Sequence, residues 1–356
     1  MAVGLCTAHV RAQEASAGGA VMVYSDSDNV TVISPRVSGR QTVAELQVDV
    51  AAGVDLVTAA SVDLVTAASP KGFSEERWQV EARAGRQWAG GSALRGWYAL
   101  SREPDFLSHQ VGVGGGVELR DRHSLLGLGL VTDQSTVGHR YDPTYGRPRT
   151  GYSLQATWTE ILGPETLFDL AYTAGRQQGM LASPYRFVRI YDPADGGQHR
   201  SAVAEAVPDA RTRHGLVVGL RSRLLPRWFV LGQARGHSDD WGLLALSATL
   251  RMSFSLTPQW TIDAEMRLHG QGRAAFYRSA YATWPQAPAW RTADKELGPM
   301  RTWQGGLHVQ WRPFGLRPPL VAAGLGADVV RFDYLDYQWL AGRTALVTLA
   351  HLTWEP

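Results

Sequence analysis

The amino-acid sequence predicts an all-β fold, an up-and-down transmembrane antiparallel β-barrel of about 16 strands with short periplasmic turns and long extracellular loops. Apolar and polar residues alternate with a period of two along many segments. These segments run for roughly 10–14 residues, a length suited to crossing a bilayer at a tilt. Short turns alternate with long polar connections. The sequence has no run of about 18 apolar residues, so a transmembrane helix is not expected.

The alternation is clearest in the segment 259–271, QWTIDAEMRLHGQ. One face carries Trp, Ile, Ala, Met and Leu, and the other carries Thr, Asp, Glu, Arg and His. Because successive strand residues point to opposite sides, one face suits lipid and the other suits a polar lumen. The segments 77–84 and 244–256 alternate in the same way. The residues predicted to line the lumen and to set permeation are Arg83, Arg251, Asp263, Glu265, Arg267 and His269.

The strand count rests on these alternating segments. Counting back from the C-terminal segment 343–354 gives about 13 strands from residue 75 onward. Three further candidates precede them, at 19–25, 29–35 and 41–53. An even total of 16 fits a bacterial single-chain barrel, and 14 is the alternative if the first hairpin stays outside the wall. Tryptophans at strand ends predict an interfacial girdle, formed by Trp158, Trp228, Trp260, Trp311 and Trp354.

The net charge and the N-terminal segment indicate which partners and which cellular location are expected. The formal net charge is +2, from 35 basic and 33 acidic residues, so nucleic acid is not expected as a partner. The start of the chain resembles the tail of a secretory signal, with cleavage expected before Gln13. Residues 1–12 are therefore predicted to be a signal-peptide remnant, and residues 13–356 a single outer-membrane β-barrel domain. An ordinary N-terminal tail is the alternative.

An eight-residue sequence, VDLVTAAS, occurs at 54–61 and again at 62–69. Fully extended, the two copies would span roughly 55 Å, which exceeds a hydrocarbon core of about 30 Å. Strand counting places the repeat in an extracellular connection before residue 75. There it would either fold into the lumen as a plug or form an ordered loop or hairpin that extends the wall. The plug hypothesis names Asp55, Thr58, Asp63 and Thr66 as the constricting residues.

Two short motifs are candidates for a metal site or a catalytic site. Asp26 and Asp28 offer alternating oxygen ligands of the kind Ca²⁺ favours, but the glycine and distal glutamate of an EF-hand loop are missing. A simple Asp/Asn turn is the preferred interpretation there. His237, Ser238 and Asp239 bring a base, a nucleophile and a carboxylate together. Adjacent strand residues point to opposite sides, so these three seldom form a catalytic triad, and no catalytic residue and no cofactor are expected.

The long connections are the remaining candidates for function. Those at 135–150 and 179–211 each contain Tyr-Asp-Pro, which is above all a turn former. The connection 272–300 is rich in aromatic residues. It is predicted to be either a binding surface or a cap over the barrel mouth.

The chain resembles an uncharacterised bacterial family of predicted outer-membrane β-barrel proteins, known only as a domain of unknown function. The resemblance is carried by residues 24–39, YSDSDNVTVISPRVSG, and by the repeated VDLVTAAS motif. Weaker similarity extends through the strands to the C-terminus. The resemblance implies an outer-membrane location and the company of exported thioredoxin-like and flavin-attaching proteins. It supplies no catalytic residues.

The expected function is a porin-like channel, or a membrane housing for a periplasmic or extracellular complex with redox proteins among its members. A barrel enzyme with an active site in the extracellular loops is the alternative, as is a closed structural or adhesion barrel; enzyme activity is not expected. The expected partners are the outer-membrane lipid bilayer, the barrel-assembly machinery and periplasmic redox proteins. The expected location is the bacterial outer membrane.

Overall fold

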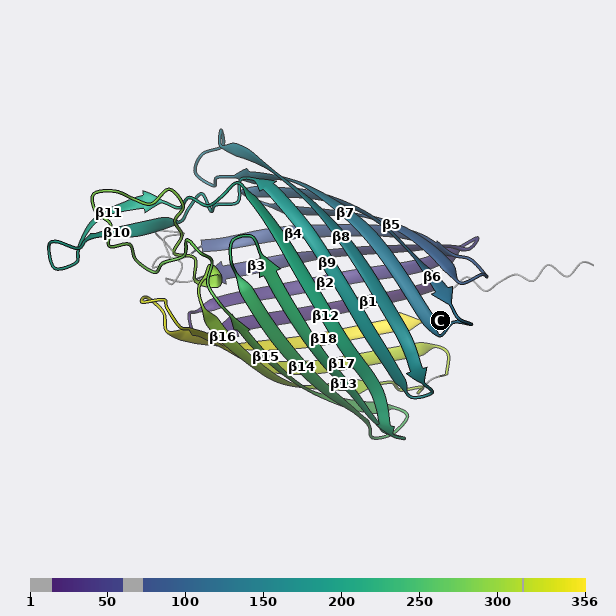
Figure 1. Ribbon diagram of the computed structural model, residues 1–356. Coiled ribbons are helices and arrows are strands. Elements are labelled where there is room, and N and C mark those ends of the chain that lie inside the picture. Colours follow the sequence, from purple (N-terminus) through teal and green to yellow (C-terminus); the bar gives the residue numbers. More distant parts are fainter. Residues whose placement is uncertain (1–14, 60–72, 316) are drawn as a thin grey trace, which may run out of the picture.

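The protein folds as a closed barrel of 16 antiparallel strands, seen in a computed structural model that describes residues 15–59, 73–315 and 317–356 (Figure 1). Each barrel strand pairs with the next in sequence, except that β9 pairs with β12 because β10 and β11 form a separate two-stranded sheet. β1 pairs with β18 and closes the barrel. The predicted signal-peptide remnant, residues 1–12, lies outside the described residues.

The strand bounds confirm the predicted count of 16, with three strands before residue 73 and 13 barrel strands from there on. The first nine strands are β1 (Ala15–Asp26), β2 (Val30–Val43), β3 (Leu46–Ala59), β4 (Phe73–Gln87), β5 (Ser92–Glu103), β6 (Phe106–Leu119), β7 (Ser124–Gly138), β8 (Gly146–Gly163) and β9 (Thr166–Gly179). The later elements are β10 (Phe187–Asp192), β11 (Gln198–Ala204), β12 (Ala210–Leu225), β13 (Trp228–Asp239), β14 (Leu244–Ser255), β15 (Trp260–Gln271), the 3₁₀ helix η1 (Lys295–Leu297), β16 (Met300–Trp311), β17 (Leu320–Tyr334) and β18 (Gly342–Glu355).

The two ends of the barrel differ in their connections. At the end where β1 begins and β18 ends, most strands are joined by two to four residues, as at 120–123, 226–227 and 256–259. We call this the turn end. The longest described connections, 180–209 and 272–299, both leave the opposite end, which we call the loop end. This asymmetry is the one predicted, and in outer-membrane barrels the short turns face the periplasm.

The strand faces are sorted in the reverse of a soluble protein. On β15, Met266 and Leu268 are 53% and 48% exposed, whereas Arg267 and His269, which alternate with them, are half-buried. The same contrast recurs around the wall, because outward-facing apolar side chains need lipid and inward-facing polar side chains need water. In the described part of the chain, no helix is long and apolar enough to cross a membrane.

The predicted tryptophan girdle is confirmed at the turn end. Trp228 and Trp260 begin their strands there, and Trp311 ends its strand there. The indole of Trp260 stacks against that of Trp311 with ring centroids 6.1 Å apart, and Trp228 packs on Phe254 at 4.7 Å. Trp158 and Trp354 lie near the same end of β8 and β18. Aromatic rings at this level suit the boundary between hydrocarbon and headgroups.

The second strand is longer than predicted and continues through Pro35 to Val43. Proline has no N–H, so the ladder to β3 omits Ser34 and Pro35, while the pairing with β1 runs on without a break. The third strand consequently begins at Leu46, after a turn in which Ala44 and Glu45 both have positive φ.

Residues 54–59, the described part of the first VDLVTAAS copy, belong to the barrel wall. β3 runs to Ala59, and Val54 lies opposite Trp78 in the ladder to β4. The prediction that the whole repeat lies in a connection is therefore wrong for this copy. The length argument excludes a single strand over both copies, but it leaves one copy free to be strand. The second copy, with Asp63 and Thr66, lies outside the described residues.

An ion pair fastens the junction of the first and last strands, which we call the seam. The Nη1 of Arg343 on β18 lies 3.4 Å from Oδ2 of Asp26 on β1, and the two side chains are 18% and 0% exposed. Oδ2 of Asp26 also accepts a hydrogen bond from the Tyr24 hydroxyl at 2.7 Å. Its Oδ1 accepts from the backbone N–H groups of Asp28 and Val30. Asp26 therefore organises the β1–β2 turn and the seam, as the turn interpretation expects.

Candidate functional site: a capped lumen

The predicted lumen residues lie on the inward-facing side of their strands, and most of their charge is paired. Nε of Arg251 donates to Oε2 of Glu265 across the β14–β15 ladder at 2.7 Å. Arg83 pairs with Glu81 on its own strand. His269 lies 2.9 Å from the Ser247 hydroxyl.

Asp263 and Arg267 stand on either side of Glu265 along β15. The ladders place Asp263 opposite Ser253 and His308. Arg267 lies opposite Thr249 and Gln304, so no carboxylate faces it across either ladder.

Most inward-facing arginines form an ion pair with a carboxylate, and Asp55 supplies one of these carboxylates. Its Oδ1 lies 3.8 Å from Nη2 of Arg36, and its Oδ2 accepts from Gln79. Asp55 is thus half-buried in the wall, with its side chain on the lumen side. Thr58 is on the other face of β3, and its hydroxyl donates to the Thr31 carbonyl. Further pairs of this kind are Arg40–Asp49, Arg77–Glu103, Arg211–Asp239, Arg221–Asp169 and Arg343–Asp26.

Exceptions to this pattern include four inward-facing arginines that lie near one another, namely Arg149 on β8, Arg213 on β12, Arg235 on β13 and Arg267 on β15. In the ranges 15–59, 73–315 and 317–356, no carboxylate lies within 4.0 Å of their guanidinium nitrogens. Arg213 donates to the amide oxygen of Gln177. The Arg149 guanidinium lies 4.8 Å from the centre of the Phe106 ring, and its Nε is buried without a hydrogen-bond acceptor. Of these four, only Arg267 is among the lumen residues predicted from the sequence.

These arginines line two adjoining cavities in the loop-end half of the lumen. One has a volume of about 700 Å³ and is lined by Arg149, Arg213 and Arg235. The other, of about 480 Å³, is lined by Arg149, Arg235 and Arg267 together with His237 and His269. Because Arg149, Arg235 and His237 belong to both, the two cavities form one cationic chamber.

Connections 180–209 and 272–299 pack together over this chamber, and we call them the cap. Tyr277 and Ala274 from one connection form an apolar cluster with Val207 from the other and with Trp241. A second cluster joins the β10–β11 hairpin to Tyr281. Figure 1 shows this hairpin projecting beyond the barrel mouth. At the base of the cap, side chains of both connections border the 480 Å³ cavity. Of the two alternatives left open for 272–300, the cap fits its position, and binding at its surface stays a prediction.

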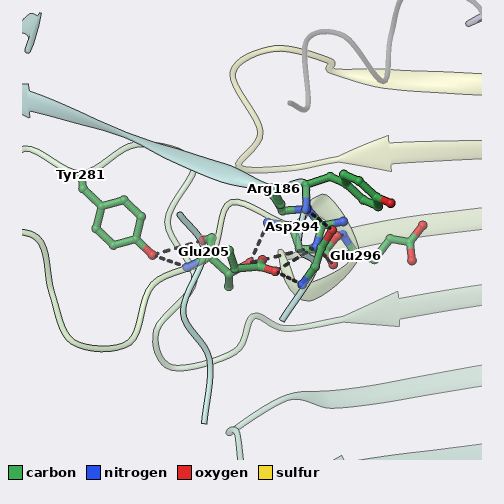
Figure 2. A network of polar contacts seen from close by, with 8 residues as sticks. Arg186, Glu205, Tyr281, Asp294 and Glu296 are labelled. Atoms are coloured by element: carbon green, nitrogen blue, oxygen red, sulfur yellow. Dashed lines mark hydrogen bonds and ion pairs between the residues drawn. The ribbon is translucent and has the colours of Figure 1, made fainter. Parts of the chain in front are cut away.

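A buried polar network joins the two connections of the cap (Figure 2). Nη1 of Arg186 lies 2.8 Å from Oδ2 of Asp294 and 3.3 Å from Oε1 of Glu205. The Glu205 carboxylate also accepts from the Ser183 N–H at 2.8 Å and from the Thr292 hydroxyl. Burial opposes the charge on Arg186, but Asp294 and Glu205 outweigh it and raise the pKa of the guanidinium. We call Arg186, Glu205, Thr292 and Asp294 the cap network.

We expect the cap to lose stability at alkaline pH, because it contains buried tyrosines. Burial raises the pKa of Tyr277 and Tyr281 above the ordinary value near 10. A raised pKa in the folded state means that their stabilisation is complete below pH ~10 and is lost as the pH rises through the folded value. Tyrosinate absorbance should show a late-ionising component, and protease should cut the cap only at such pH. Tyr277→Phe should reduce that component; an unchanged titration would contradict the assignment.

The His237–Asp239 motif and the two Tyr-Asp-Pro motifs have structural roles in the loop-end region. Ser238 lies on the face of β13 opposite His237 and Asp239, so the three lack the geometry of a triad. Oδ1 of Asp239 accepts from the N–H groups of Trp241 and Leu243, and its Oδ2 binds Arg211. The Tyr-Asp-Pro motifs are turns, as predicted: Asp142 accepts from the Thr144 N–H, and Asp192 from the Ala194 N–H.

Comparison with known proteins places the chain in a family. The model of the family described as "Protein of unknown function (DUF3570)" matches residues 133–316, more than half of the chain. The N-terminal motifs at 24–39 and 54–69, on which the resemblance rested, lie outside the matched segment. A comparison with curated proteins finds no match.

Solved structures share the fold at low sequence identity. A bacterial polysaccharide outer membrane secretin is 11% identical with a TM-score of 0.53, over 96% of this chain and 97% of that one. OccK2 (OpdF) of Pseudomonas aeruginosa, solved with glucuronate, is 9% identical with a TM-score of 0.47, over 97% and 98%. The siderophore receptor PirA of Pseudomonas aeruginosa is 11% identical with a TM-score of 0.47, and the match covers 89% of this chain.

The chain spans about half of that receptor, 56% of its length, so the likeness is one of barrel fold alone. The closed barrel, its lipid-facing apolar surface and the family match agree with one another. The chain is a bacterial outer-membrane β-barrel and belongs to the family of proteins of unknown function DUF3570.

Proposed function

We propose that the protein is a porin-like channel whose entrance is narrowed by the cap. The observation that carries this proposal is a polar inner face with cavities at both ends of the barrel. Besides the cationic chamber at the loop end, a cavity of about 330 Å³ near the turn end is lined by Arg40, Asp49 and Arg83. Barrels of about 16 strands are wide enough to leave an aqueous channel unless a plug fills them.

The residues predicted to set permeation fit this proposal in two groups. Paired charges such as Arg251 and Glu265 supply a hydrophilic wall with little net field, because each cation stands beside an anion. The unpaired arginines of the chamber supply a positive field at the loop end. We expect the second group to dominate ion preference.

Conductance of the purified protein in planar lipid bilayers tests the proposal. We expect stepwise, ohmic currents, because the cavities lie along a polar wall that water can wet. Folded protein is verified by its heat-modifiable mobility on a denaturing gel. Folded protein that leaves the membrane silent, and that also fails to admit small solutes into liposomes, would overturn the channel and favour a closed barrel.

A surface-binding or housing barrel is the second candidate, favoured by the hairpin β10–β11 outside the mouth and by exposed Trp284 and Trp290 in the cap. It predicts the silent outcome of the conductance test. Assembly by the barrel-assembly machinery is part of either proposal. The final strand supports it, because Leu346, Leu352 and Trp354 share its exposed, lipid-facing side. Periplasmic redox partners, implied by the family resemblance, would meet the turn end.

A further inference from the structure

We propose that the cationic chamber is a binding site for small organic or inorganic oxyanions, solutes that carry carboxylate or phosphate groups. The site consists of Arg149, Arg213, Arg235 and Arg267, which we call the arginine site. The inference deepens the proposed channel by naming its solute class. Binding itself is measurable in detergent and does not require an open pore.

The first argument is charge. Elsewhere in the lumen, arginines such as Arg221 and Arg251 are held by a carboxylate of the neighbouring strand. In the chamber, four guanidinium groups from four strands line the cavities without such partners in the described part of the chain. Asp133, a wall carboxylate of the 700 Å³ cavity, is bound by Ser108, Gln110 and Ser135 instead, and the four cations outnumber it. Low-dielectric walls around a charged cleft focus its potential and raise the local concentration of counter-ions. The chamber therefore concentrates anions.

The second argument is position. Across the β12–β13 ladder, Arg213 stands opposite Asp239, and Arg235 lies two inward-facing positions further along β13. Arg235 and Arg267 are in turn linked through β14, whose Ser247 and Thr249 stand opposite them. The guanidinium groups are thus spread over several rungs of the wall. An oxyanion can be passed from one guanidinium to the next, as a channel site requires.

The third argument is an unsatisfied donor. Nε of Arg149 is buried and has no acceptor. A buried donor without a partner is rare, because it loses its hydrogen bonds to water without replacement. The Phe106 ring, 4.8 Å from this guanidinium, helps to hold it at the cavity wall. Guanidinium groups bind carboxylate and phosphate through paired, charge-assisted hydrogen bonds, so an oxyanion in the chamber can bind the remaining N–H groups of the same guanidinium, which lines both cavities.

Two carboxylates of the cap line the same chamber, and one of them is unpaired among the described residues. Glu296 of η1 lines the 480 Å³ cavity, and Figure 2 shows its side chain directed away from the cap network. Within residues 15–59, 73–315 and 317–356 its carboxylate has no ion-pair partner within 4.0 Å. Asp294 lines the cavity too, but it is bound to Arg186. Glu296 is therefore the group that an entering anion meets and repels, and its charge should weaken binding.

Calorimetric titration of the detergent-solubilised protein with citrate and, separately, inorganic phosphate tests the site. We expect saturable binding in low salt that Arg235→Gln combined with Arg267→Gln weakens about tenfold or more, since each guanidinium contributes a charge-assisted contact. Glu296→Gln should strengthen binding by a few-fold. Arg223→Gln, an exposed arginine at the turn end, is the matched control and should leave binding unchanged. Citrate binding alone assigns carboxylates, and phosphate binding alone assigns phosphates.

Unchanged affinity in the Arg235→Gln, Arg267→Gln variant, or no binding of either anion to folded wild-type protein, would overturn the arginine site. Reversal potentials in bilayers give an independent measure, since the same variant should lose several-fold of its anion preference. Binding in detergent with a silent bilayer would sink the channel and leave the site standing. Conductance without anion binding or anion preference would support the channel and overturn the arginine site.

Discussion

Glu205→Ala is expected to open the cap while the barrel stays folded. The Glu205 side chain is 2% exposed and is held by Arg186, the Ser183 N–H and the Thr292 hydroxyl. Its removal leaves the buried guanidinium with Asp294 alone and leaves two donors without an acceptor. Breaking a buried pair in this way costs about 3–5 kcal/mol. Limited proteolysis should therefore cut within 180–209 and 272–299, with the heat-modifiable mobility of the barrel retained.

The control for this variant is Glu165→Ala at the turn end. Glu165 forms an ion pair of 3.8 Å with Arg223, and both side chains are exposed. Such pairs contribute about 0–1 kcal/mol, so proteolysis of the cap should not change. If the cap of Glu205→Ala resists protease like that of the control, the cap network is not what joins the two connections. An opened cap should also raise conductance, because the cap borders the chamber from above.

Asp26→Ala is expected to destabilise the whole barrel. The carboxylate at the seam has four hydrogen-bonding or ionic partners, which lie on β1, β2 and β18 and in the β1–β2 turn. Without it the buried Arg343 loses its counter-ion, at a cost of about 3–5 kcal/mol. Denaturant unfolding of the refolded protein in lipid vesicles should show a lower midpoint. Ser25→Ala, next to it on β1, removes only an exposed contact of 3.5 Å with Thr31 and should change the midpoint little.

The double variant Asp26→Ala, Arg343→Met separates the two contributions of the seam. Removing both charges leaves no uncompensated ion, so part of the lost stability should return. A double variant less stable than Asp26→Ala would mean that the Arg343 side chain acts through packing on Phe332, which its guanidinium approaches at 4.7 Å.

The barrel could be predicted from the sequence because its signal is local. Alternation along a segment such as 260–271 requires no knowledge of the neighbouring strand, and the tryptophans mark strand ends by themselves. The predictions were wrong where pairing with a neighbouring strand determines whether a residue belongs to a strand. Pro35 reads as a strand end, yet β1 continues to pair with β2 past it. Residues 54–59 of the first repeat copy read as loop, yet β2 and β4 hold them in the wall.

The candidate site was predicted only in part, for the same reason. The six predicted lumen residues include four from one strand, because a single segment displays its inner face plainly. Which charges cancel depends on register: Arg251 meets Glu265, whereas Arg235 meets Val217 and Ser247. Arg149, Arg213 and Arg235 all lie on the polar face of their strands. The alternation of polar and apolar residues could therefore have identified them as lumen residues. Their common chamber is a property of the closed barrel.

The seam joins residues 317 positions apart in the chain. Every barrel strand except β1 and β18 finds both partners among strands close to it in sequence, and β1 keeps one unpaired edge until β18 is in place. A row of free N–H and C=O groups on an edge strand is a template for pairing with other chains. Closure therefore decides between a monomeric barrel and aggregation. A chain cut short before β18 leaves both β1 and β17 with open edges, so a late truncation is as damaging as an early one.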